Sequence, residues 1–240
     1  MLTYEQIKDD RKVFLAVTGL THKEFKQLLP AFRQAYGQTY PANKTLTGTR
    51  RHRQIGGGRL GTLTSWEQKL LFVLSYVKTY PLQAMHGLTF ELSQSQTNYW
   101  LHHLLPVLKG ALDNLDVIPE RDPHQFAQAQ RRRHETPELI IDGTERRRQR
   151  PKDPEKQTLH YSGKKKVHTD KNVVIVNAKS KRVGYLSETY PGKTHDKKIA
   201  DREAIVYPRE TVLDQDTGFQ GYAPRVREIR QPKKSRASKR

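Results

Sequence analysis

Apolar residues recur at helical spacing in the first part of the chain, and polar capping patterns mark where helices begin. Thr21 is followed three positions later by Glu24, which is typical of a capping box, and apolar side chains then repeat every three or four positions. The pattern predicts a helix over residues 21–36. Residues 37–61 contain prolines, glycines and a run of basic residues, and we expect a flexible basic linker there.

A second capping pattern, Thr64 with Glu67, begins another apolar stripe that ends at Tyr80, just before a proline. A short helix is predicted over residues 82–87. A turn then leads into a longer helix that is capped by Ser93 and has leucines on its buried side.

The short helix, the turn and the longer helix together have the pattern of a helix-turn-helix. Amides and hydroxyls at the start of the second helix suit the edges of bases in the major groove. The candidate base-reading residues are Gln94, Gln96, Thr97 and Asn98. The same pattern also fits an ordinary helical bundle with a polar surface, because this geometry is common in proteins that bind no DNA.

After residue 136 the periodicity changes to short apolar runs that are rich in β-branched residues, and such runs predict strands. The expected elements are strands over residues 139–141, 166–178, 183–189 and 211–214 and a helix over residues 195–203. A helix between strands predicts a mixed α/β core rather than a bundle.

These patterns divide the chain into four parts. We expect a helical DNA-binding region over residues 1–120, a linker over residues 121–136, a mixed β-sheet domain over residues 137–230 and a basic tail over residues 231–240. The tail has five cations, no acid and no large apolar group, and is therefore expected to be disordered.

Composition and charge narrow the class of partner. The chain has 240 residues, enough for one large or two small domains, and a net charge of +19. Such a charge attracts polyanions and makes binding sensitive to salt. Charge alone fits a nucleic-acid-associated protein without chemistry as well as an enzyme that acts on DNA or RNA.

Other features exclude several classes of protein. The chain has no cysteine, which removes disulfides, thiol catalysis and cysteine-based zinc sites. No apolar stretch is long enough to span a membrane, and the first residues are too polar for a signal peptide. We therefore expect a cytoplasmic, nucleoid-associated protein with no membrane partner.

Two aspartates are the strongest candidates for chemistry. Asp142 and Asp216 each follow an apolar run and precede a glycine, so each is expected at the end of a strand. Carboxylates on neighbouring strand ends suit two Mg²⁺ ions about 4 Å apart, as phosphodiester cleavage requires. Alternatives stay open: Asp142 also fits a hairpin turn, Asp216 fits a loop, and Asp214 competes with Asp216 on the same strand face.

Four segments then carry a family resemblance by their order and spacing. They are residues 142–145, 161–169, 191–196 and 216–221. The chain resembles the insertion-sequence transposases of the DDE superfamily, the group with an N-terminal helix-turn-helix and a Harbinger-like endonuclease domain. The resemblance extends from about residue 15 to residue 235.

The resemblance implies an RNase H-like endonuclease domain in which Asp142 and Asp216 are the first two catalytic, metal-binding acids. A complete site would hold two Mg²⁺ or Mn²⁺ ions. In such enzymes a water first hydrolyses the DNA strand at the end of the element, and the freed 3′-hydroxyl then attacks target DNA. The implied partners are the element's terminal inverted repeats, target DNA and further copies of the chain on that DNA.

The resemblance also indicates residues around this site. Glu145, His195 and Asp196 are typical of the family near the metal acids, although His195 and Asp196 would also fit a simple helix cap. Two basic triplets flank the first motif, and we expect them to hold DNA phosphates. These triplets are Arg146, Arg147 and Arg148, and Lys164, Lys165 and Lys166.

The family's third acid is a glutamate on a helix well downstream of the second aspartate. Only 240 − 216 = 24 residues follow Asp216, and their sole glutamate, Glu228, lies in a strand-like segment. The expectation from the sequence is therefore a C-terminally truncated transposase with an incomplete RNase H-like domain, which binds DNA but cuts it poorly alone. Two alternatives are a catalytically inactive DNA-binding remnant that regulates a full-length copy, and a host nuclease domesticated from such an element.

Overall fold

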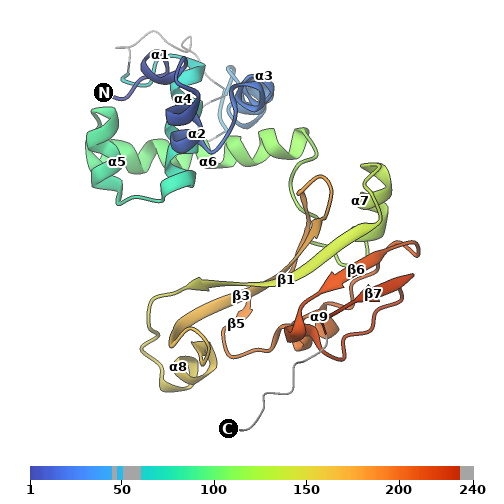
Figure 1. Cartoon of the computed structure of the whole chain (residues 1–240). Coiled ribbons are helices and arrows are strands. Elements are labelled where there is room, and N and C mark those ends of the chain that lie inside the picture. Colours follow the sequence, from blue (N-terminus) through green and yellow to red (C-terminus); the bar gives the residue numbers. More distant parts are fainter. Residues whose placement is uncertain (45–47, 51–60, 233–240) are drawn as a thin grey trace. The chain divides into compact units, whose positions relative to one another are not determined.

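The computed structural model describes residues 1–44, 48–50 and 61–232, and the chain divides into two compact units (Figure 1). The first unit is Met1–Ile118 and the second is Pro119–Arg240. Much of the predicted basic linker and nearly all of the predicted basic tail lie outside the described residues.

The regular elements among the described residues of the first unit are helices, apart from one isolated β-bridge between Lys44 and Arg50. Its helices are α1 (Tyr4–Ile7), α2 (Arg11–Thr18), α3 (His22–Thr39), α4 (Trp66–Thr79), α5 (Gln83–Phe90) and α6 (Gln94–Asn114). The sequence pattern had not indicated α1 and α2. No helix among the described residues is long and apolar enough to cross a membrane.

Hydrogen bonds at the helix starts test the predicted caps. The capping box before α3 is present, because the Glu24 carboxylate accepts a hydrogen bond from the Thr21 backbone at 2.7 Å and the Thr21 hydroxyl accepts one from the Glu24 backbone. Ser93 caps α6 as predicted. The prediction was wrong at α4, where Ser65 rather than Thr64 is the cap and accepts a hydrogen bond from the backbone of Gln68.

Helices α5 and α6 cross very closely at Gly87. A Cβ atom at this position would lie 2.5 Å from the Leu92 carbonyl oxygen and 2.7 Å from the Thr97 hydroxyl oxygen. Glu91 adopts a left-handed backbone conformation with φ of 53° in the turn between the two helices. The helix-turn-helix therefore depends on a glycine at the crossing and on a tight three-residue turn.

The second unit is built on a seven-stranded mixed sheet. Its elements are α7 (Phe126–Arg132), β1 (Glu138–Arg147), α8 (Pro154–His160), β2 (Tyr161–Ser162), β3 (Val167–Asn177), β4 (Val183–Leu186), β5 (Tyr190–Pro191), α9 (Asp196–Glu203), β6 (Val212–Gln215), a short 3₁₀ turn (Thr217–Phe219) and β7 (Glu228–Arg230). The order is β2-β3-β1-β6-β7, and β4 and β5 also pair with β3. β1 is antiparallel to β3 and parallel to β6, which is parallel to β7.

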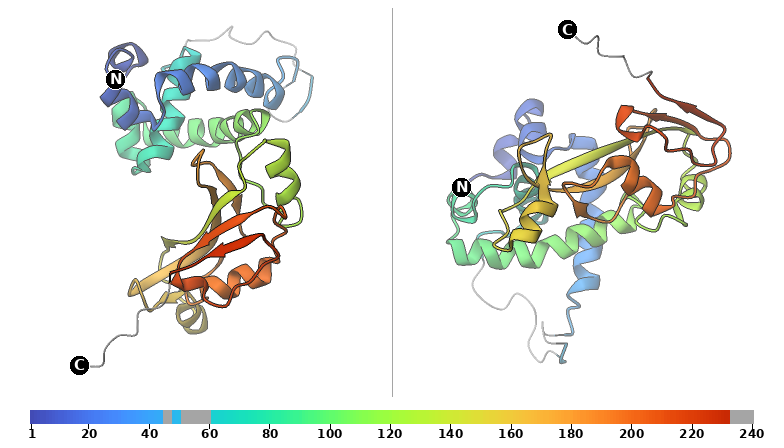
Figure 2. Two further views of the ribbon diagram at one scale, coloured as in Figure 1. Left: turned by 45° about the vertical axis from the view of Figure 1, so that its right-hand side comes forward. Right: turned by 90° about the horizontal axis from the view of Figure 1, so that it is seen from below.

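Side chains alternate between the two faces of β1. Leu139 and Ile141 point into an apolar core that also contains Ile199 and Ala200 of α9, so this helix packs on one face of the sheet (Figure 2). Asp142 points to the opposite face and is exposed. A helical region followed by a mixed sheet confirms the predicted fold class, and the second unit is consistent with an RNase H-like fold.

Residues 121–136, which we had expected to link two domains, belong to the second unit instead. They contain α7, whose Phe126 is fully buried against the rings of Tyr185 and Tyr207. The segment is rich in charge, but its few apolar residues gather on one side of a short helix. Burial of that side makes the segment part of the core.

Candidate metal centre and DNA interface

Asp142 lies inside strand β1 rather than at its end. β6 pairs with β1 only as far as Ile141, whereas β3 continues to pair with β1 up to Arg147. The strand therefore runs on through Gly143, and the hairpin turn considered for this position is not formed. Asp142 is the first residue of β1 beyond its pairing with β6. Pairing with β3 keeps β1 extended past this point.

Asp216 follows β6 directly and begins the 3₁₀ turn. Its Oδ1 accepts a hydrogen bond from the backbone of Gly218 at 2.9 Å, and Oδ1 of Asp142 accepts one from the backbone of Gly143 at 2.7 Å. Oδ2 of either aspartate accepts no hydrogen bond from the part of the chain that the structure describes. A hydrogen bond to Oδ1 thus orients each carboxylate, and Oδ2 is available to bind a ligand.

Both aspartates line one cavity of about 730 Å³, together with Asp214 and Arg230. Asp214 is paired in register with Ile140 of β1, so it lies on the same face of the sheet as Asp142. The parallel pairing of β1 and β6 thus brings together two acids that are 74 positions apart in the sequence (216 − 142 = 74). Asp214 shares the cavity and stays a competing ligand.

The donors in this cavity fit a hard divalent cation. Mg²⁺ is usually held by one or two carboxylates, with water and substrate phosphate completing its coordination. Asp142 and Asp216 supply two such carboxylates, and no lysine or arginine among the described residues neutralises them by an ion pair. The described residues contain no cluster of three or more acids or histidines that would hold an ion by itself.

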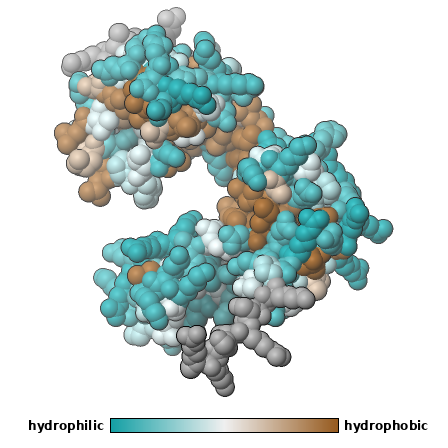
Figure 3. Space-filling view, viewed as in Figure 1, coloured by the Kyte–Doolittle hydropathy of each residue, from teal (hydrophilic) through white to brown (hydrophobic). Residues whose placement is uncertain are grey.

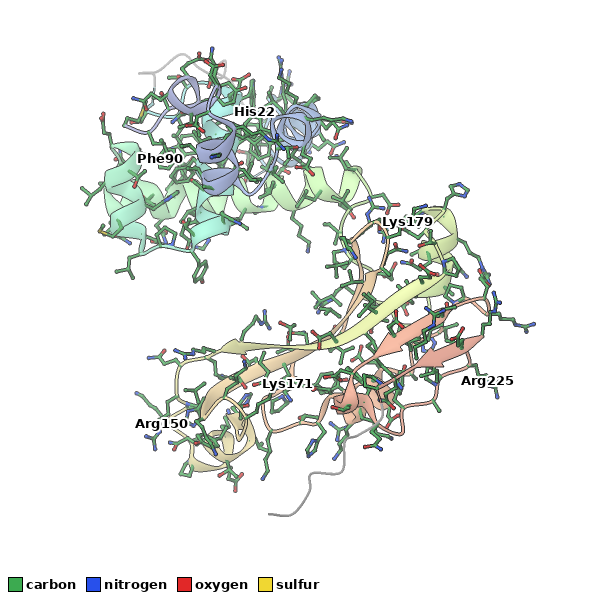
Figure 4. The ribbon with its side chains drawn as sticks, in the orientation of Figure 1. His22, Phe90, Arg150, Lys171, Lys179 and Arg225 are labelled. Atoms are coloured by element: carbon green, nitrogen blue, oxygen red, sulfur yellow. The ribbon has the colours of Figure 1, made fainter. Side chains whose placement is uncertain are left out.

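Lys171 is a buried cation that sequence reasoning missed. It lies on β3 (Figure 4). Its side chain is 11% exposed, and its Nζ lies 3.4 Å from Oε1 of Glu145 and 3.1 Å from Oδ1 of Asp196. The same ammonium donates to the carbonyl of Thr194 at 3.0 Å. Strand alternation was the available signal, since position 171 lies on the same face as the buried Val173.

Glu145 is held in its ionised form inside this cluster. Burial raises the pKa of its carboxyl, but hydrogen bonds from Ser162 and Thr169 and the charge of Lys171 lower it by more, so the net pKa lies below the ordinary 4.5. Glu145 is three positions from Asp142 and therefore faces the other side of β1. It supports the fold beneath the cavity and does not line it.

Asp196 sits between the two glycines that follow the metal acids. A Cβ atom at Gly143 would lie 2.6 Å from Cγ of Asp196, and one at Gly218 would lie 3.3 Å from its Oδ2. Asp196 is the first residue of α9, and His195 occupies the cap position but makes no capping side-chain hydrogen bond. Asp196 thus contacts both segments that carry a candidate metal acid, and through Lys171 it connects them to β3.

The two basic triplets differ in how the fold uses them. Arg146 donates to Asn172 at 3.0 Å, and Arg148 donates to Asp170 at 2.9 Å and contacts His160 at 3.0 Å, so these two arginines are engaged within the unit. Arg147 is exposed. The other triplet, Lys164, Lys165 and Lys166, is exposed at the tip of the β2–β3 hairpin and forms no ion pair with any described residue.

The start of α6 exposes only some of the candidate base-reading residues. Gln94 and Gln96 are exposed and Asn98 is half-buried, and Gln94 and Asn98 both donate to the side-chain oxygen of Gln83. Thr97 is fully buried and donates to the carbonyl of Ser93 at 2.9 Å, so it cannot reach a base. The expectation for Thr97 is therefore corrected: it faces α5 at the close helix crossing.

Comparison with known families relates both units of the chain to the same superfamily. Residues 61–113 match the family described as the helix-turn-helix of DDE superfamily endonuclease, and residues 141–239 match the family described as DDE superfamily endonuclease. The chain belongs to the DDE superfamily of endonucleases and carries the DNA-binding helix-turn-helix of that family. Enzymes of this family typically use a divalent metal. Comparisons with curated proteins and with solved structures find no match.

Proposed function

We propose that this protein is the DNA transposase of an insertion sequence, which cuts DNA at the ends of its element and joins them to a target. In this proposal Asp142 and Asp216 are the catalytic acids that hold the divalent cation. The observation that supports it most strongly is the single cavity lined by both acids, at the point where β6 leaves β1.

The residues of the chain have distinct roles in this proposal. A divalent cation in the cavity would polarise the scissile phosphate and lower the pKa of an attacking water. The backbones of Gly143 and Gly218 orient the two carboxylates by hydrogen bonds before any ligand arrives. Asp196, held by Lys171, keeps the two acid-bearing segments in position.

DNA is held by other parts of the chain. Gln94 and Gln96 at the start of α6 would contact base edges of the terminal inverted repeats. The lysines at the tip of the β2–β3 hairpin would contact phosphates without regard to sequence. The net charge of +19 fits a protein that binds a long stretch of duplex.

A nicking assay tests the proposed activity. The purified chain would be incubated with a duplex that carries the terminal repeat flanking its gene, with Mg²⁺, with Mn²⁺ or with a chelator. We expect weak metal-dependent nicking by the chain alone, and we expect it to be lost in Asp142→Asn and Asp216→Asn, since each variant removes one anionic metal ligand. Asp214→Asn, from the same cavity, tests the competing ligand and should retain nicking if Asp142 and Asp216 hold the cation. Nicking that survives in Asp142→Asn or persists with the chelator would contradict the proposal.

A second candidate function is a DNA-binding regulator that does not cut. The observation in its favour is that no group of three or more metal-binding side chains occurs among the described residues. Under this alternative the wild-type chain binds the terminal repeat but nicks it with neither metal. A gel shift and the nicking assay on the same duplex together separate the two functions, because binding without nicking supports the regulator and binding with nicking supports the transposase.

A further inference from the structure

A second cavity, of about 610 Å³, lies in the second unit and shares no lining residue with the cavity of the aspartates. It is bounded by α8, by the β2–β3 hairpin and by the loop after β5. Arg150 enters it from the segment after β1 and lies beside α8 (Figure 4). The surface around α8 and the hairpin is largely hydrophilic (Figure 3).

Specific local interactions build this second cavity. Asp153 caps α8 by accepting a hydrogen bond from the backbone of Glu155 at 2.8 Å. The backbone of Lys193 donates to the carbonyl of Leu159 at the end of α8, at 3.1 Å. Gly192 permits this approach, since a Cβ atom there would lie 2.1 Å from the hydroxyl oxygen of Thr169 on β3.

The lining carries positive charge and no carboxylate. Nε and Nη2 of Arg150 donate to the side-chain oxygen of Gln157 at 3.1 and 2.9 Å, which holds the guanidinium in one orientation. Lys193 is exposed and forms no ion pair with any residue that the structure describes. The three lysines of the hairpin tip follow directly after Gly163, which also lines the cavity. These groups suit a phosphate.

Two aromatic side chains, Tyr161 and His168, also line this cavity. Tyr161 on β2 is 42% exposed, and its ring meets the ring of His168 on β3 edge to face, with centroids 5.6 Å apart. The two residues are directly opposite each other in the hairpin. An exposed tyrosine beside two cations suits a base and its phosphate, because every base can stack on an aromatic ring.

We propose that this cavity binds one nucleotide of single-stranded DNA, with the base on the ring of Tyr161 and the phosphate between Arg150 and Lys193. In a duplex the faces of the bases are stacked on each other, so only an unpaired nucleotide can use the ring. The inference rests on the proposed function in that DNA cutting is what exposes such a strand.

Fluorescence anisotropy of the full chain tests this site with a labelled short oligothymidine and a labelled hairpin duplex of equal length. Tyr161→Ala should weaken oligothymidine binding about tenfold, the effect of losing one stacked base, and change duplex binding less than about twofold. Tyr161→Phe keeps the ring and should bind as the wild type does. Arg150→Gln with Lys193→Gln should weaken oligothymidine binding and reduce its dependence on salt.

Photochemical crosslinking gives an independent readout on the wild-type chain. An oligothymidine with one iododeoxyuridine should crosslink to Tyr161, as located by mass spectrometry. Oligothymidine binding unchanged in a folded Tyr161→Ala, an equal loss for duplex, or a crosslink confined to other segments would each overturn the proposal. If Tyr161→Ala melts early, Tyr161→Leu and the crosslink decide.

Nicking and oligothymidine binding, both measured on the wild-type chain, distinguish this site from the proposed function, because its cavity shares no lining residue with that of the aspartates. Absence of nicking by the wild-type chain, with Tyr161-dependent binding intact, would overturn the proposed cutting activity alone. Normal nicking with no Tyr161-dependent binding would overturn the nucleotide site alone.

Discussion

Lys171 is buried, unlike an ordinary surface lysine. It lies between the carboxylates of Glu145 and Asp196, and all three side chains are at least three-quarters buried. Removing one member of such a cluster is costly, since the remaining charges stay buried without compensation. The cluster thus couples β1, β3 and α9 beneath the candidate metal cavity.

Replacing Lys171 by methionine keeps the length of the side chain and removes its charge. We expect Lys171→Met to lower the free energy of unfolding by about 3 kcal/mol, because Glu145 and Asp196 then lose their shared cation. Urea unfolding monitored by circular dichroism measures this. Lys164→Met, on the exposed hairpin tip, is the matched control and should change stability by less than about 0.5 kcal/mol. Equal effects of the two substitutions would contradict the role of Lys171.

The lowered pKa of Glu145 predicts how the stability of the second unit changes at acidic pH. Its pKa in the folded chain lies below the ordinary 4.5, so its stabilising contribution is complete above pH 4.5 and is lost as the pH falls through the folded value. Glu145→Gln should therefore lose less stability than the wild type when urea unfolding is compared near pH 7 and below pH 4.5. A larger loss on acidification in Glu145→Gln than in the wild type would contradict the assigned direction.

At the scale of elements, close packing of α5 on α6 fixes the helix-turn-helix. Gly87→Ala should destabilise the first unit by about 1–3 kcal/mol, because the added methyl meets the Leu92 carbonyl and the Thr97 hydroxyl. Gly110→Ala is the control: its Cβ would lie 3.6 Å from the Cβ of Ala35, an ordinary contact, so the higher helix propensity of alanine should stabilise α6. Thermal unfolding compares the two, and a neutral Gly87→Ala would refute the close crossing.

The same elements show what the sequence could and could not predict. Periodicity and capping located α3 and β3 to within a few residues, because their apolar positions repeat over long stretches, and the cap at Ser93 located the start of α6. The same patterns predicted that strand β1 ends at Ile141, since the residues that follow are polar and include a glycine. Pairing with β3 keeps β1 extended to Arg147, and such tertiary pairing is not visible in the local pattern.

The candidate site was predictable only in part, because the sequence shows local patterns but not contacts between distant segments. Asp142 and Asp216 stand out because each follows an apolar run, and the family resemblance selected them from the other acids. Lys171 and the cavity beside α8 depend on contacts between segments far apart in the chain. Thr97 fitted a polar helix start by residue type, but its position on the helix turns it toward α5.

At the scale of the whole molecule, positive charge should govern nonspecific DNA binding. Lys164→Gln, Lys165→Gln and Lys166→Gln together should lower the slope of log affinity against log salt by about 0.9 for each lysine that contacts a phosphate, equally for all duplex sequences. Arg148→Gln is the contrast, because this arginine is already paired with Asp170, and it should leave the slope unchanged. Anisotropy titrations at several salt concentrations measure both, and a sequence-specific loss in the lysine variant would contradict its role.

The central claim is that Asp142 and Asp216 jointly hold a divalent cation. Electron paramagnetic resonance of Mn²⁺ titrated into the purified chain tests it most directly, because bound Mn²⁺ loses the sharp signal of the free ion. We predict that Asp142→Asn and Asp216→Asn each weaken binding at one site, and that the double variant weakens it little further than the more affected single variant. Binding that is absent in the wild type, or that survives in both single variants, would contradict the claim.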